Sequence, residues 1–160
     1  MNRALGRLAA ATPVIVRLII GGMMVVHGLD KLLDGPAGFG QFLGQLEVPA
    51  PTLLAWLVTL LELVGGAMLV VGFLSRLVAL LMTVELIAAI ALVSWPSGLI
   101  AAEGVGYERD LAYIAGLIVV LLLGPGRPSL DHRLGLEEAV PTLAVRPGGK
   151  TSGTRLSGPV

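Results

Sequence analysis

Cysteine is absent from this chain of 160 residues, and charged side chains make up only 14% of the sequence. The lack of cysteine excludes disulfides, thiolate metal sites, iron–sulfur ligation by the chain and any thiol relay built from its own residues. Soluble domains carry about 25% charged residues, so the charge content is low for a protein in water. The formal net charge is zero, which indicates neither nucleic-acid binding nor an acidic substrate.

The sequence also lacks the short motifs that mark common catalytic and nucleotide-binding sites. It contains no P-loop, no dinucleotide-binding fingerprint, no H-E-x-x-H and no G-x-S-x-G. With two histidines in the whole chain, His27 and His132, we predict neither a metal site nor a bis-histidine haem.

Apolar residues are abundant, at 55% of the sequence with a mean hydropathy of +0.88. A domain of this length leaves roughly a third of its unfolded surface exposed, so lipid must be the solvent for much of the chain. A membrane-spanning helix needs about 20 apolar residues. Windows of about this length, bounded by Gly and Pro, lie at residues 14–33, 52–73, 76–95 and 110–124. The sequence therefore predicts an all-α polytopic membrane protein with a bundle of four transmembrane helices.

Lysine and arginine gather in the segments that would flank these helices on one side of the membrane. By the positive-inside rule, we predict that both termini are cytoplasmic. Residues 1–13 then form an N-terminal segment, residues 125–140 a juxtamembrane segment, and residues 141–160 a disordered basic tail. The outer connection at residues 34–51 is either an interfacial segment or a solvated loop.

Four of the ionisable side chains within the predicted spans stand out, namely Arg17, His27, Glu62 and Glu85. A charged group at the bilayer centre costs about 2.5–3.5 kcal/mol on insertion scales, so these residues are candidates for function. A helix rises ~1.5 Å per residue, which places both glutamates near the midplane and His27 and Tyr113 at a similar depth. Arg17 falls near the inner boundary, where it is either a snorkelling anchor or a cation that binds a substrate.

The other three residues have structural interpretations as well. His27 is either a neutral hydrogen-bond partner or a ligand and proton-transfer group. Glu62 and Glu85 are either protonated groups bonded across helices or parts of a proton relay. Small residues follow each glutamate at three and four positions, Gly65 and Gly66 in the first case, which indicates that each carboxyl faces a helix contact. We therefore predict that the two glutamates and His27 converge inside the bundle.

The order of these features resembles that of a known family. Arg17 in the first span, HGLDK with Lys31 at its outer end, E-x-x-G-G from Glu62, Arg76 after a glycine, and GPGRPSLD together resemble the DoxX family of bacterial four-helix membrane proteins. The resemblance covers about residues 14–131 and carries these four numbered residues as motif positions. It implies a multi-pass protein of the bacterial inner membrane, with relatives tied to quinone-linked thiosulfate oxidation, oxidative stress or thiol-redox assemblies.

The residues and the resemblance together favour an integral inner-membrane subunit of a quinone-linked redox or oxidative-stress complex. Glu62, His27 and Glu85 are expected to handle protons, because quinone chemistry moves protons with electrons. The residues expected to bind the quinone are Arg17, Lys31, Gly65, Gly66 and Tyr113. The chain has no intrinsic cofactor in this hypothesis, so a redox protein partner supplies the electrons. The lipid bilayer and a second copy of the chain are the other expected partners.

Two further functions stay open. A non-catalytic scaffold that holds a cytoplasmic redox enzyme at the membrane would depend on the residues after Leu136 and not on Glu62 or His27. A small proton-coupled transporter or lipid-handling protein would use the glutamates as coupling sites. The repetition of E-x-x-small-small at Glu62 and Glu85 is a hint in that direction, because transporters commonly contain internal repeats.

Overall fold

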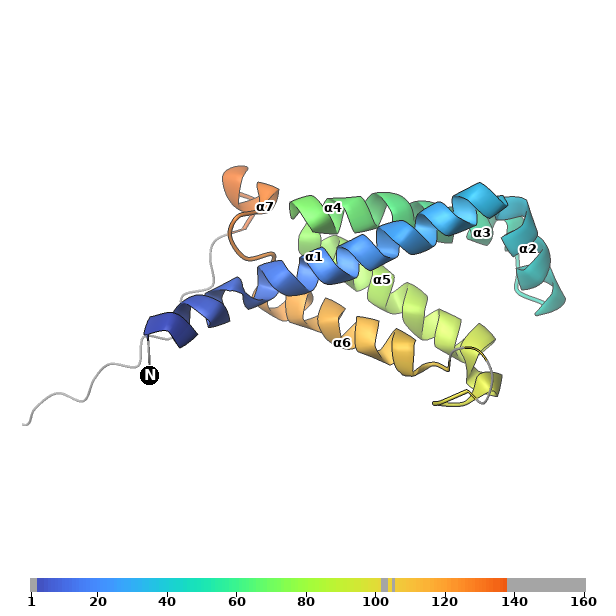
Figure 1. The fold of residues 1–160 in the computed structure, drawn as a ribbon. Coiled ribbons are helices and arrows are strands. Elements are labelled where there is room, and N and C mark those ends of the chain that lie inside the picture. Colours follow the sequence, from blue (N-terminus) through green and yellow to red (C-terminus); the bar gives the residue numbers. More distant parts are fainter. Residues whose placement is uncertain (1–2, 102–103, 105, 138–160) are drawn as a thin grey trace, which may run out of the picture.

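The computed structural model describes residues 3–101, 104 and 106–137, with side chains from residue 9 onward. Every regular element within these ranges is a helix, so the predicted all-α fold is confirmed (Figure 1). The predicted tail at residues 141–160 lies outside the described residues, as does the end of the predicted juxtamembrane segment.

Four helical rods form the body of the molecule, and two shorter helices lie at its ends. The second and third rods each contain a π-helical turn, η1 and η2, and the third ends in a 3₁₀ turn, η3. In chain order the elements are α1 (Arg3–Asp34), α2 (Pro36–Gln45), α3 (Pro51–Leu60), η1 (Leu61–Gly65), α4 (Gly66–Val71), α5 (Ser75–Ala89), η2 (Ile90–Ser94), η3 (Trp95–Ser97), α6 (Glu108–Leu123) and α7 (Leu130–Arg133).

Three of the rods are long and apolar enough to cross a membrane. They cover Ala9–Asp34, Pro51–Val71 and Ser75–Ser97, each close to a window predicted from hydropathy. The fourth rod, α6, has 16 residues and is shorter than the three candidates, which have 26, 21 and 23 residues. The structure therefore shows three candidate spans, and the fourth span and the side of the membrane on which each end lies stay predictions.

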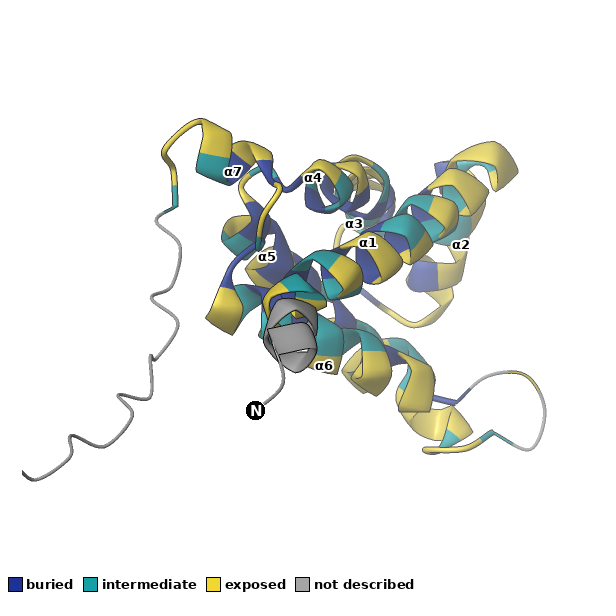
Figure 2. Ribbon diagram, turned by 60° about the vertical axis from the view of Figure 1, so that its left-hand side comes forward, coloured by how far each residue is buried: buried dark blue, intermediate teal, exposed yellow. Residues whose placement is uncertain are grey.

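The rods bury several charged side chains and expose many large apolar ones, which is unusual for a soluble protein. Arg17, Glu62 and Asp110 are each 5% exposed or less, whereas large apolar residues such as Leu33 and Ile19 are 77% and 59% exposed. Figure 2 shows exposed residues along the outer faces of all the long helices. This distribution fits a protein whose outer surface contacts lipid tails.

All four rods contribute to one apolar core. Met24 of α1, Leu69 of α4, Met82 of α5 and Leu117 of α6 are almost fully buried against one another. A smaller cluster joins Leu43 of α2 to the start of α3. The packing of α6 into the main core explains why a helix of 16 residues is held firmly between α1 and α5.

Glycines allow α1 to lie unusually close to the second rod. A Cβ atom on Gly28 would stand 2.4 Å from the backbone nitrogen of Leu63, and one on Gly66 would stand 2.8 Å from that of Val25. Real side chains do not tolerate such distances, so only glycine fits at either position. Close approach through small residues is a common way for helices to associate in lipid, where apolar burial between helices gains little.

The connection at residues 34–51 is mainly helical. Gly35 has a φ of 88° and separates α1 from α2, which begins at Pro36. One face of α2 is buried, through Pro36, Gly40 and Leu43, against α3. Of the two interpretations of this segment, the structure favours a packed amphipathic helix over an open loop.

The two ends of the described chain meet at one end of the molecule. In Figure 1 the N-terminal end of α1 and helix α7 lie at the same end, while α2 and the segment after η3 lie at the opposite end. We call these the α7 end and the α2 end. The side of the membrane on which the two termini lie stays a prediction.

Candidate functional site

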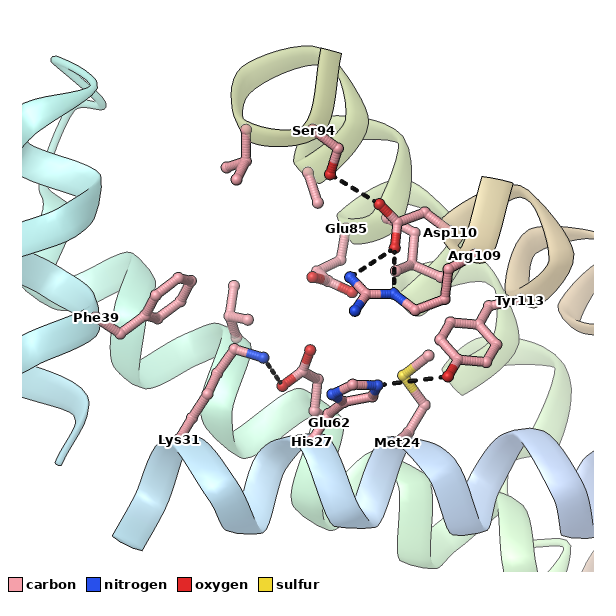
Figure 3. Close-up of a pocket in the computed structure, with 14 residues that line it drawn as sticks. Met24, His27, Lys31, Phe39, Glu62, Glu85, Ser94, Arg109, Asp110 and Tyr113 are labelled. Carbon is pink, nitrogen blue, oxygen red and sulfur yellow. Dashed lines mark hydrogen bonds and ion pairs between the residues drawn. The ribbon is translucent and has the colours of Figure 1, made fainter. Parts of the chain in front are cut away.

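A cavity of about 180 Å³ lies between α1, η1, α5, η2 and α6 toward the α2 end. It brings together His27, Lys31, Glu62, Glu85 and Tyr113, all of which were predicted as site residues (Figure 3). The apolar part of its wall is formed by Met24, Phe39, Val58, Leu86, Ala89 and Val93. A water molecule takes about 30 Å³ in the liquid, so the cavity has room for a group larger than water.

Lys31 and Glu62 form an ion pair at the cavity wall, with 2.6 Å between Nζ and Oε2. The Lys31 side chain is 23% exposed and that of Glu62 is 6% exposed. The ammonium also lies 5.4 Å from the ring centroid of Phe39, within the range of a cation–π contact. Lys31 thus links α1 to η1 and α2. It also gives a counter-ion to Glu62, whose carboxylate was predicted to lie near the membrane midplane.

Glu62 lies within a π-helical turn, which the sequence pattern did not predict. The turn η1 covers Leu61–Gly65 and interrupts the second rod between α3 and α4. A π turn inserts one residue and rotates the following side chains relative to the preceding ones, and such turns are frequent at functional sites. Here the turn carries Glu62 toward α1 while Gly66 remains in contact with α1 one turn later.

His27 and Tyr113 meet across the α1–α6 contact. His27 Nε2 and the Tyr113 hydroxyl lie 3.4 Å apart, and the two rings pack edge to face with centroids 6.0 Å apart. The prediction that these residues lie at similar depth is confirmed by this contact. An imidazole and a phenol in hydrogen-bond contact are both able to hold or pass a proton.

Two charged residues at the outer boundary of the fourth predicted span, Arg109 and Asp110, also line the cavity. Asp110 is 3% exposed and accepts hydrogen bonds from the Arg109 guanidinium at 3.2 Å and from the Ser94 hydroxyl at 2.9 Å. These residues counted only toward the topology prediction. Asp110 lies three positions before Tyr113 on α6, a spacing that places both side chains on one face of a helix. This spacing was the sequence feature from which Asp110 could have been predicted as a site residue.

Glu85 lines the same cavity but makes no comparable contact. Its Oε2 atom is buried and has no hydrogen-bond partner among the described residues. Figure 3 places its carboxyl between the Lys31–Glu62 pair and the Arg109–Asp110 pair. A buried polar atom without a partner is costly in a membrane protein, so this atom marks the place where a bound group would gain most.

Three predicted site residues lie away from the cavity. Gly66 faces Met24 and Val25 of α1, and Gly65 faces Val78 and Met82 of α5. Both glycines therefore serve helix packing, and neither lines the cavity. The prediction that they bind a ligand there disagrees with their positions.

Arg17 is the third residue away from the cavity, and it is also not a snorkelling anchor. It is 3% exposed, and its Nη1 donates to the carbonyls of Leu69 and Val70 at 3.1 and 3.0 Å. Its Nη2 donates to the carbonyl of Pro128. Arginine at this position adds a donor to carbonyls at the C-terminus of α4, where the negative end of the helix dipole favours a cation.

Gly72 makes this arrangement possible. It ends α4 with a φ of +73°, and the Phe73 amide donates to the Met68 carbonyl at 2.9 Å, as in the Schellman motif. A Cβ atom at Gly72 would collide with the Arg17 guanidinium. The glycine that precedes Arg76 in the family resemblance thus has a structural cause.

The segment at residues 124–137 contacts the start of α5 and the end of α6 at the α7 end. The Asp131 carboxylate accepts from the amides of Leu74 and Ser75, at 2.6 and 2.9 Å, and so satisfies the start of α5. Arg76 pairs with Glu137 at 2.5 Å and donates to the Leu121 carbonyl at the end of α6. These contacts explain the Arg76 and GPGRPSLD motif positions as structural ones.

Apolar helices with a charged interior define the chain as a helical integral membrane protein, and its surface contacts the lipid bilayer. The chain belongs to the DoxX family, whose family profile matches residues 12–95. The resemblance seen in the order of residues is thereby confirmed.

Three relatives support this assignment. An "Uncharacterized membrane protein Rv3486" of Mycobacterium tuberculosis is 33% identical over 129 residues, which cover 74% of this chain and 78% of that protein. The "Inner membrane protein YphA" of Escherichia coli is 25% identical over 131 residues, covering 78% and 93%. The "Putative oxidoreductase CatD" of Bacillus subtilis is 36% identical over 76 residues, covering 48% and 54%. No solved structure matches the chain.

Proposed function

We propose that this chain is an integral inner-membrane subunit of a quinone-linked redox or oxidative-stress complex, and that the cavity holds the quinone head. The observation that carries the proposal is the cavity itself. It joins hydrogen-bond donors, proton-holding groups and an apolar wall within helices that face lipid. The proposal includes a fourth span at α6 and cytoplasmic termini.

The lining residues fit a quinone head. Such a head is a flat apolar ring with two carbonyl oxygens, so it needs donors for the oxygens and apolar surface for the ring. Lys31, Arg109 and Tyr113 carry donors around the cavity, and Phe39 and Leu86 are among its apolar wall residues. The isoprenoid tail of the ligand would lie among the lipid chains that surround the helices.

A bound quinone supplies a carrier of two electrons and two protons. The groups of this chain hold and pass the protons. His27 Nε2 and the Tyr113 hydroxyl exchange a proton across their 3.4 Å contact, and Glu62 holds its charge against Lys31. The His27–Tyr113 contact and the Lys31–Glu62 pair are therefore the two places in the cavity to which we assign the protons of the two quinone oxygens.

The electrons come from a redox protein partner. The sequence offers no cysteine for a thiol or iron–sulfur carrier, so electron transfer requires another chain. The name of the Bacillus subtilis relative, which includes the word oxidoreductase, supports a redox role. A family link to oxidative-stress assemblies agrees with the same role.

Filling the cavity tests the proposal. Ala89 lines the cavity, and the adjacent Ala88 is exposed on the lipid side of the same helix, so Ala89→Phe and Ala88→Phe form a matched pair. The protein is placed in lipid nanodiscs and titrated with decylubiquinone, and tryptophan fluorescence reports binding, since Trp95 follows the cavity residue Ser94. We expect saturable quenching in the wild type and in Ala88→Phe, and its loss in Ala89→Phe.

Other outcomes separate the remaining functions. Quenching that never saturates in the wild type overturns the quinone site. Unchanged partner-dependent quinone reduction in Glu62→Gln overturns the proton role of that acid. A scaffold would lose its partner when the residues after Leu136 are deleted, whereas Glu62→Gln and His27→Ala would leave partner binding unchanged. Proton-dependent flux of a solute in proteoliposomes would point to a transporter.

A further inference from the structure

The cations and acids that line the cavity do not match in number. Lys31 is paired with Glu62 at 2.6 Å, and Arg109 is paired with Asp110 at 3.2 Å. Among the described residues of the cavity, these are the two lysine or arginine side chains. Glu85 is therefore left as the acid without a counter-ion, and its Oε2 atom has no hydrogen-bond partner.

The position of Glu85 makes it the natural contact for a bound ligand. It lies on α5, opposite α1 across the cavity, and Figure 3 places its carboxyl between the two ion pairs. Its charged neighbours are Glu62, Lys31 and Asp110. Each paired residue already has a partner of opposite charge, so a ligand that binds Glu85 disturbs neither pair.

We propose that Glu85 forms the direct hydrogen bond to the ligand, and that the cavity selects an uncharged head bearing a carbonyl or hydroxyl oxygen. This inference rests on the proposed function and narrows its ligand class. It also moves the ligand contact away from Glu62, whose carboxylate is committed to Lys31. Glu62 and Asp110 become positioning residues that hold the cations in place.

Charge explains why an anionic head is rejected. A carboxylate or phosphate would need a free cation, whereas both cations of the described lining are already paired. It would also lie beside the paired carboxylates of Glu62 and Asp110, where like charges repel in a medium of low dielectric constant. Displacing one of these acids from its cation would leave a buried charge without a partner.

A cationic head is also disfavoured, for a different reason. An ammonium would pair with Glu85, but it would have to leave water and enter a cavity within membrane-spanning helices, which is costly for a charged group. Lys31 and Arg109 would repel it there. A neutral carbonyl or hydroxyl avoids both costs and still satisfies the unpartnered Glu85 oxygen, because a carboxyl group either donates or accepts a hydrogen bond.

Competition between head groups tests this selectivity. Wild-type protein in nanodiscs is loaded with decylubiquinone and then titrated with 2-dodecanone, decanoate or decylamine, which share a similar chain and differ in the charge of the head. We expect 2-dodecanone to displace the quinone and the two ions to leave it bound. Displacement by decanoate or decylamine at the same concentration as by 2-dodecanone would overturn the inference.

Substitution of Glu85 tests the contact itself. We expect Glu85→Leu to weaken decylubiquinone binding about tenfold, as the loss of one hydrogen bond does. Glu85→Gln keeps a donor and an acceptor and is expected to stay within about threefold of the wild type. Glu47→Leu is the control, because Glu47 is exposed and lies outside the cavity. Circular dichroism and gel filtration confirm that each variant folds.

The outcomes distinguish this inference from the function on which it rests. Saturable binding in the wild type together with unchanged affinity in Glu85→Leu would overturn the inference and leave the quinone site intact. Absence of saturable binding in the wild type would overturn both.

Discussion

Lys31 and Glu62 lie 31 positions apart in the sequence and form a 2.6 Å ion pair between α1 and η1. The pair is largely shielded from solvent, and its acid is held by a π-helical turn. Removing one partner of such a pair leaves a buried charge, whereas removing both does not. The pair therefore couples α1 to η1 and fixes the charge of the cavity wall.

A double-mutant cycle measures this coupling. We expect Lys31→Met to lower the free energy of unfolding by about 2 kcal/mol, because Glu62 is left buried and unpaired. Glu62→Gln is expected to have a similar effect through Lys31. The double variant should recover much of the loss, as measured by thermal unfolding in detergent. Additive losses in the double variant would show that the two side chains are not coupled.

Gly28 tests the close contact of α1 with the second rod. We expect Gly28→Ala to destabilise the protein by about 2 kcal/mol, because its Cβ atom would stand 2.4 Å from the Leu63 nitrogen and would push the helices apart. Gly22→Ala is the matched control, since no atom lies within 4 Å of a Cβ atom there. That control should be neutral or slightly stabilising, because alanine favours helix. Thermal unfolding of both variants checks the difference, and equal behaviour would argue against the packing.

Arg17 tests the fastening of the helix ends at the α7 end. We expect Arg17→Met to speed hydrogen exchange at residues 72–75 and 128–131, because the carbonyls of Leu69, Val70 and Pro128 lose the hydrogen bonds from the guanidinium. The exposed Arg133 is the matched control, as Arg133→Met removes the same charge at the same end. Exchange unchanged in Arg17→Met, or raised equally in both variants, would contradict the structural role.

Because the sequence contains no cysteine, labelling of single introduced cysteines tests the membrane topology. Gly38→Cys on α2 and Leu136→Cys after α7 each introduce one thiol into a chain that has none, at open or exposed positions. With four spans and cytoplasmic termini, we expect a membrane-impermeant maleimide to label Gly38→Cys in intact cells. Leu136→Cys should react only after the cells are opened. The reverse labelling would show that the orientation is inverted.

Hydropathy and spacing predicted the helices and the meeting of Glu62, Glu85 and His27, because a buried charge in an apolar window stands out locally. They could not predict η1, since a π turn leaves no pattern in composition. The contact from Arg17 to Pro128 joins residues 111 positions apart, and such a partner is fixed by the three-dimensional fold. Asp110 was counted only as a charge flanking a span, because its burial depends on contacts with Ser94 and Arg109 that the local sequence pattern does not reveal.

The central claim is that a quinone head lies in the cavity beside Glu85. Photolabelling of the wild-type protein in nanodiscs with an azidoquinone, followed by mass spectrometry of the labelled peptides, tests it most directly. We expect label on the segments 24–31 and 85–94, which line the cavity, and its loss when excess decylubiquinone is present. Label spread over the lipid-facing residues, unchanged by that excess, would contradict the claim.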